Sequence, residues 1–137
     1  MLYICLCLIK KQYNMNCKCI RVEHIRGKGF CNSAENVYIT HGLKGLGKRH
    51  FCTNSKHPFP APIEEDLNMY RNGLKWFCAF PSIEMLNKII TPNEIKALLK
   101  HGYSIYELRV KEYQVGYYQV IYTKDSIISK KCINHKF

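Results

Sequence analysis

The clearest alternation of apolar and polar positions lies in residues 75–122, and it predicts short strands and helices. Residues 75–80 (KWFCAF) are an apolar and aromatic stretch that predicts a buried strand. Pro81 ends this strand because proline has no amide to donate, and Ser82 follows at the N-cap position of a helix. The apolar residues of that helix recur at helical spacing: Ile83, Leu86, Ile89 and Ile90.

A capping box marks the start of a second helix. Thr91, Pro92 and Glu94 have the spacing at which a hydroxyl and a carboxylate each accept a backbone amide, with proline in the first turn. Gly102 is the left-handed residue expected to end this helix. The stripe expected to face the core consists of Ile95, Leu98 and Leu99.

Strands are predicted on both sides of these helices. Residues 17–25 (CKCIRVEHI) and 103–110 (YSIYELRV) predict two of them, and residues 117–122 (YYQVIY) predict another after a turn or bulge at Gly116. Residues 126–129 are a candidate edge strand, and residues 63–72 predict a short helix. Because the strands and helices come in runs, we expect a single α+β domain with small antiparallel or mixed sheets and two to three short helices. Four residues compete for the inner face of the 103–110 strand: Tyr103, Ile105, Leu108 and Val110.

The first residues of the chain allow two interpretations. Residues 2–9 (LYICLCLI) are apolar but far shorter than the ~20 residues that span a bilayer, and they lack the features of a secretory signal. Residues 1–14 are therefore interpreted as an extra strand or as a leader upstream of the true start at Met15, with residues 15–137 as the domain. Without a signal, the eight cysteines are expected to be thiols in the cytoplasm, and no membrane partner is expected.

Charge is distributed unevenly along the 137 residues. The net charge is +11, and most of it lies in the first half, where residues 1–56 carry only Glu23 and Glu35 as acids. This excess favours an anionic partner, such as nucleic acid or a phosphate-bearing ligand, although a net charge also serves solubility alone. Three aromatic residues in the basic half are candidates for stacking on bases: Phe30, Tyr38 and Phe51.

A glycine-rich basic loop and several cysteines are further candidates for chemistry. Residues 42–48 (GLKGLGK) fill the first seven positions of a P-loop, but Arg49 stands at the eighth, where the magnesium-binding hydroxyl belongs. Lys44, Lys48 and Arg49 are instead a candidate anion-binding loop, with a solvated loop as the alternative. The candidate zinc ligands by residue type are Cys17, Cys19, Cys31, His50 and Cys52. No CxxC pair supports zinc ligation, so no metal is expected and buried thiols are the simpler interpretation.

Arg21 in the first strand, Ser82 after a middle strand and Gln119 in a late strand resemble the Arg–Ser–Glu layout of ADP-ribosyltransferase-like domains. The opening RVEH also looks like small uncharacterised proteins of bacteria and their phages. The resemblance implies that Arg21 grips the phosphates and nicotinamide ribose of NAD, that Ser82 orients this ribose, and that Gln119 is the catalytic position. His24, beside Glu23, joins the candidate cofactor-binding residues. Gln119 departs from the family because an amide carries no charge to stabilise a developing cation, so a degenerate NAD-binding domain is as credible as an enzyme.

Three functions therefore remain as hypotheses. The first is an ADP-ribosyltransferase-like domain of phage or mobile-element origin that binds NAD or a related dinucleotide. The second is a basic nucleic-acid-binding module. The third is a small phage inhibitor that binds a host factor through its charged face.

Overall fold

The computed structural model of the chain describes residues 15–27, 29 and 62–137. Within these residues the strands are β1 (Cys17–His24), β2 (Trp76–Ala79), β3 (Tyr103–Val110), β4 (Tyr113–Val115), β5 (Val120–Thr123) and β6 (Ile127–Cys132). The α-helices are α5 (Ile83–Ile89) and α6 (Pro92–Lys100). Short 3-10 helices are η1 (Pro62–Glu65), η2 (Arg71–Gly73), η3 (Lys124–Ser126) and η4 (Asn134–Lys136).

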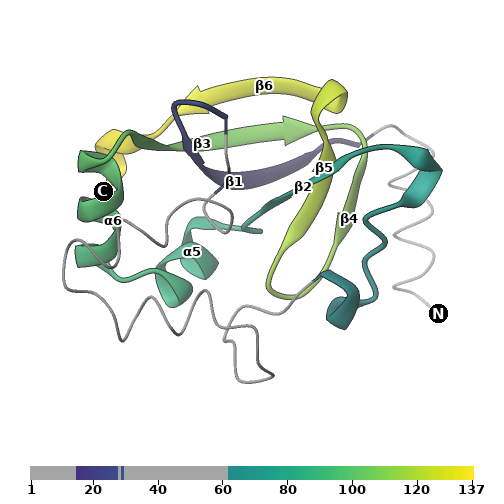
Figure 1. Cartoon of the computed structure of the whole chain (residues 1–137), viewed down its shortest axis with the longest axis horizontal. Helices are drawn as coiled ribbons and strands as arrows, with labels where there is room; N and C mark the ends of the chain where they lie inside the picture. The colour runs from purple at the N-terminus through teal and green to yellow at the C-terminus, as the bar shows by residue number, and fades with distance from the viewer. Residues whose placement is uncertain (1–14, 28, 30–61) are drawn as a thin grey trace.

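The strands form two antiparallel sheets of three strands each, which confirms the α+β class. One sheet has the order β1-β3-β6 and the other β2-β5-β4. Ile20 of β1 and Phe80, directly after β2, exchange backbone hydrogen bonds of 2.8 and 2.7 Å. This bridge sets β1 beside β2, so the two sheets meet there (Figure 1).

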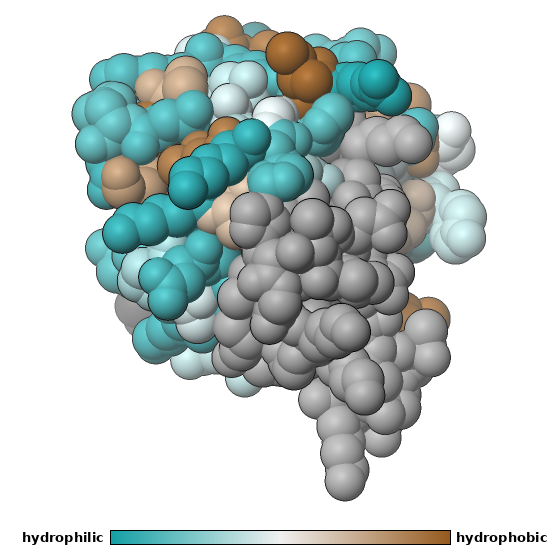
Figure 2. Space-filling model, turned by 60° about the vertical axis from the view of Figure 1, so that its left-hand side comes forward, coloured by the Kyte–Doolittle hydropathy of each residue, from teal (hydrophilic) through white to brown (hydrophobic). Residues whose placement is uncertain are grey.

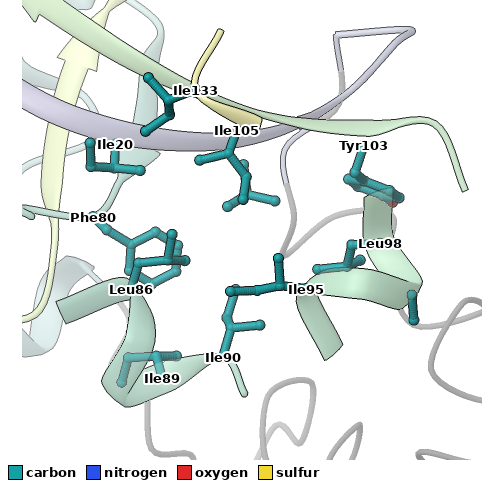
Figure 3. Packing of buried hydrophobic residues seen from close by; sticks show 12 residues of the cluster. Ile20, Phe80, Leu86, Ile89, Ile90, Ile95, Leu98, Tyr103, Ile105 and Ile133 are labelled. Carbon is teal, nitrogen blue, oxygen red and sulfur yellow. The ribbon is translucent and has the colours of Figure 1, made fainter. Parts of the chain in front are cut away.

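The strand β3 contributes to two separate parts of the core. Tyr103 and Ile105 pack with Ile20, α5 and α6, whereas Leu108 and Val110 pack with residues of the β2-β5-β4 sheet. Residues an odd number of positions apart in a strand point to opposite faces, so each half of β3 buries a different face. The four residues that competed for one inner face in the sequence are therefore all buried. Figure 3 shows the first cluster, in which Leu86 and Phe80 lie beneath Ile20.

Local sequence signals account for both helices. The Ser82 hydroxyl accepts a hydrogen bond from the Met85 amide at 3.1 Å and caps α5, as predicted. In α6, the Thr91 hydroxyl accepts from the Glu94 amide, and the Glu94 carboxylate accepts from the Thr91 amide, which completes the capping box. Gly102 has φ +84 just beyond this helix, as expected for the residue that ends it.

The predicted helix over residues 63–72 was wrong. The segment holds η1 and η2 with Asp66 at φ 59 and Asn72 at φ 59, a left-handed conformation that interrupts an α-helix. Tertiary contacts override the helical pattern: Glu65 bonds to the backbone and side chain of residues 118 and 119, and the Gln114 side chain bonds to both backbone groups of Asn68.

The predicted strand over residues 117–122 also had the wrong limits. Tyr117 and Tyr118 lie in the turn that joins β4 to β5, and the pairing resumes at Val120. β6 is longer than the edge strand expected at residues 126–129. In the described part of the chain, no helix has the length and apolar character needed to cross a bilayer.

Candidate functional site

The backbones that carry Arg21, Ser82 and Gln119 come together in the structure. Arg21 lies on β1 next to the Ile20–Phe80 bridge, and Ser82 lies two residues beyond Phe80. Gln119 directly precedes Val120, which pairs with Ala79 of β2. The three strands named by the resemblance to ADP-ribosyltransferases are thus neighbours.

The Arg21 guanidinium is held by groups of the protein. Its Nη1 donates to the Cys78 carbonyl at 2.6 Å, its Nε donates to Glu23 Oε2 at 3.2 Å, and it stacks over the Phe77 ring at 5.5 Å. A Cβ on Gly29 would lie 2.9 Å from the guanidinium, so a larger residue there would have to displace the Arg21 side chain. Glu23 in turn accepts from Lys130 Nζ at 2.8 Å. Arg21 is 6 % exposed, so it is the buried end of an ion-pair network whose other cation, Lys130, is exposed.

The Gln119 side chain and Arg21 lie on opposite faces of the β2-β5-β4 sheet. Gln119 Nε2 donates to Glu65 Oε2 at 3.0 Å, and strand alternation sets Gln119 with Ile121 rather than with Val120 and Tyr122. Arg21 instead contacts Phe77, which packs with Val120 and Tyr122. The structure therefore does not bring Arg21 and Gln119 into one cleft, and the Ser82 hydroxyl caps α5.

His24 is also separated from Arg21. Alternation along β1 directs it to the face of the β1-β3-β6 sheet opposite Arg21. There His24 Nδ1 accepts from the Arg26 amide at 3.2 Å, and the ring meets the Tyr103 ring edge at 5.0 Å. These contacts give His24 a structural role at the end of β1.

The thiols around Arg21 are poor nucleophiles. Burial raises the pKa of Cys19 to about 12, with the neighbouring Cys17 adding to the rise and Arg21 opposing it. Burial also raises the pKa of Cys78, against the lowering effect of Arg21. Because the thiolate is the reactive form, these two groups are structural.

Several predicted residues lie outside the described residues. They are the anion-binding loop of Lys44, Lys48 and Arg49, the candidate stacking residues Phe30, Tyr38 and Phe51, and the possible zinc ligands Cys31, His50 and Cys52. Within residues 15–27, 29 and 62–137, no three His, Cys, Asp or Glu side chains come together as a metal site.

The structure reveals a basic surface that the sequence did not indicate. Lys18 and Arg109 are direct partners in the register of β1 and β3, and Arg109 is paired in turn with Ser129 of β6. One row further along, Glu107 is paired with Lys131 and forms a 3.3 Å ion pair with Lys18. Paired residues share a face, so these side chains form one array, which we call the basic face (Lys18, Arg109, Lys131, Ser129 and Glu107). Glu107 is partly buried and the other four residues are exposed. The basic face lies toward the end of β3, whereas α5 and α6 lie toward its start (Figure 1).

Comparison with known protein families places the chain beside a phage protein. A family described as the Bacteriophage T4 Y00F protein matches residues 15–135. No curated protein and no solved structure matches the chain.

Proposed function

The chain belongs to the Bacteriophage T4 Y00F protein family, and on this premise we propose that it is a phage protein that binds nucleic acid through its basic face, in the host cytoplasm. The family covers most of the chain, including all three strands that carry the basic face.

The observation that carries the proposal is the direct pairing of Lys18 with Arg109. Like charges directly opposite each other destabilise a sheet. Glu107 offsets one charge, and Lys131 adds another on its other side, so the array keeps an excess of positive charge. The exposed pairing of Lys18 with Arg109 lowers the stability of the sheet. An anionic partner that neutralises these two positive charges would explain why they are there.

The composition of the basic face favours contact with phosphates over contact with bases. Its five residues include no aromatic ring on which a base can stack, and in the Lys18–Arg109 row the neighbour on β6 is a serine. Lysine, arginine and serine are typical ligands of phosphate oxygens, which fix orientation without reading sequence. We therefore expect binding of low sequence specificity.

Salt dependence tests this proposal. Affinity for a short DNA duplex, measured by fluorescence anisotropy at several salt concentrations, is expected to fall steeply with salt. The variant Lys18→Gln/Arg109→Gln/Lys131→Gln should reduce the slope of log K against log salt by about 3, since each phosphate contact contributes about 0.9.

The matched control removes the same charge elsewhere. Lys88, Lys96 and Lys100 are exposed on α5 and α6. The coloured surface in Figure 2, which brings forward the side where α6 lies in Figure 1, is mainly hydrophilic. The triple glutamine variant of these lysines should keep nearly the slope of the unmodified protein. Equal slopes for both triple variants would mean that only net charge matters, and would contradict a site on the basic face.

Dinucleotide binding beside Arg21, where β1 meets β2, is the second candidate, because Arg21 and Ser82 lie close to the bridge between Ile20 and Phe80. The Gln119 side chain, which bonds to Glu65, is not part of this candidate site. Arg21 would have to exchange a present contact for a ligand phosphate. In that case NAD or ADP-ribose raises the melting temperature, and Arg21→Lys, which lacks the planar fork, removes the rise. An unchanged melting temperature with both ligands contradicts this candidate.

A further inference from the structure

Exposed apolar side chains gather where η1 meets the turn between β4 and β5. Their exposed fractions are 80 % for Ile63, 70 % for Tyr117, 57 % for Val115 and 37 % for Tyr118. Figure 1 shows η1 beside this turn. We call these four residues the tyrosine surface. Folding does not explain them, since they contribute little buried area.

Internal contacts hold the tyrosine surface in place. Glu65 Oε1 accepts from the Tyr118 amide at 2.7 Å, and its other oxygen accepts from Gln119 Nε2 at 3.0 Å. A Cβ on Gly116 would lie 2.7 Å from the Glu65 carboxyl carbon, so the glycine permits this close contact. The Tyr117 and Tyr118 rings meet edge to face at 4.7 Å. Aromatic side chains held in this way lose little conformational freedom on binding, which is typical of interface anchors.

The charge beside the tyrosine surface is opposite to that of the protein as a whole. Glu64, Glu65 and Asp66 are consecutive in a chain of net charge +11, and Glu64 and Asp66 are exposed. Such a rim repels phosphate groups and attracts cations. Its chemistry therefore differs from that of the basic face.

We propose that the tyrosine surface binds a partner protein through a segment that combines apolar side chains with lysine or arginine. The apolar side chains of the partner would cover Ile63, Val115 and Tyr117, and its cations would meet Glu64 and Asp66. This site is independent of nucleic-acid binding, so the protein has one surface for an anionic partner and another for a cationic, apolar one.

Peptide binding tests the proposal. A labelled peptide of alternating leucine and lysine is titrated with the full chain and binding is followed by anisotropy, beside a peptide with glutamate in place of each lysine. We expect saturable binding of the lysine peptide and much weaker binding of the glutamate peptide. Tyr117→Ser should weaken binding of the lysine peptide roughly 30-fold, the effect of losing an interface anchor. Glu64→Lys should weaken it in a salt-dependent manner.

Tyr70→Ser is the matched control, because Tyr70 is 87 % exposed and lies outside the tyrosine surface. It should leave the affinity unchanged. The proposal is overturned if neither peptide binds, if the glutamate peptide binds equally well, or if Tyr70→Ser acts like Tyr117→Ser. A concentration-dependent dimer that Tyr117→Ser abolishes would also overturn it, since a second copy would then cover the surface. The triple variant of the basic face should bind the lysine peptide normally, which separates this test from that of nucleic-acid binding.

Discussion

Replacing Glu23 with glutamine is expected to lower the free energy of unfolding by about 3 kcal/mol. Glu23 bonds to Arg21 at 3.2 Å and to Lys130 at 2.8 Å, and the Arg21 side chain is only 7 % exposed. Removing one partner of a buried ion pair leaves the other charge uncompensated away from water, which is among the more destabilising single changes. Urea unfolding followed by the fluorescence of Trp76 should show a lower midpoint with an unchanged slope.

Glu107→Gln is the matched control for this prediction. Glu107 is 19 % exposed, close to the 17 % of Glu23, but its partner Lys18 is 54 % exposed. An ion pair with a solvated cation contributes about 0–1 kcal/mol, so this variant should be nearly as stable as the unmodified protein. Equal losses in the two variants would show that burial of Arg21 does not decide the effect.

Leu86→Ala should lower the free energy of unfolding by about 2–5 kcal/mol. Leu86 is fully buried on α5, in the cluster shared by Ile20, Phe80 and α6, and its truncation leaves a cavity that the neighbours fill only in part. Thermal unfolding followed by circular dichroism measures the loss. Leu74→Ala makes the same chemical change at a side chain that is 43 % exposed, and should cost less than about 0.5 kcal/mol. If Leu86→Ala also lowered the free energy of unfolding by less than about 0.5 kcal/mol, the packing described around α5 would be contradicted.

The sequence predicted the elements whose signals are local. Ser82, Thr91 and Glu94 cap the helices within three residues of the amides they bind, so their spacing alone identifies them. β3 has the predicted limits and β1 ends one residue earlier than expected, at His24. Short-range hydrogen bonding and apolar spacing are sufficient for such elements.

The remaining features depend on contacts between distant residues. Glu65 leaves a helical pattern because its carboxylate bonds to the turn at Tyr118, 53 positions away. The two buried halves of β3 became distinguishable only once the helices covered one face and the second sheet the other. The helix predicted over residues 63–72 was wrong because the sequence does not show the contact between Glu65 and the turn at Tyr118.

For the candidate site, the sequence predicted which backbone segments lie near one another but not which way their side chains face. The order of strands brought Arg21, Ser82 and Gln119 near one another, but the facing of each side chain depends on register, and a shift of one residue reverses it. The basic face was missed for the same reason. Lys18, Arg109 and Lys131 lie far apart in the sequence, and only the pairing of three strands makes them neighbours.

The pairing of β1 with β3 has a consequence for how the protein is made. Residues 25–102 lie between these strands, and ribosomes add about 5–20 residues per second, so β1 waits several seconds for its partner. During this time Cys19, Ile20 and Val22 are without the neighbours that bury them in the finished protein. Nascent chains with such exposed strands are prone to aggregate. We therefore expect the yield of folded protein in an infected cell to depend on the supply of host chaperones.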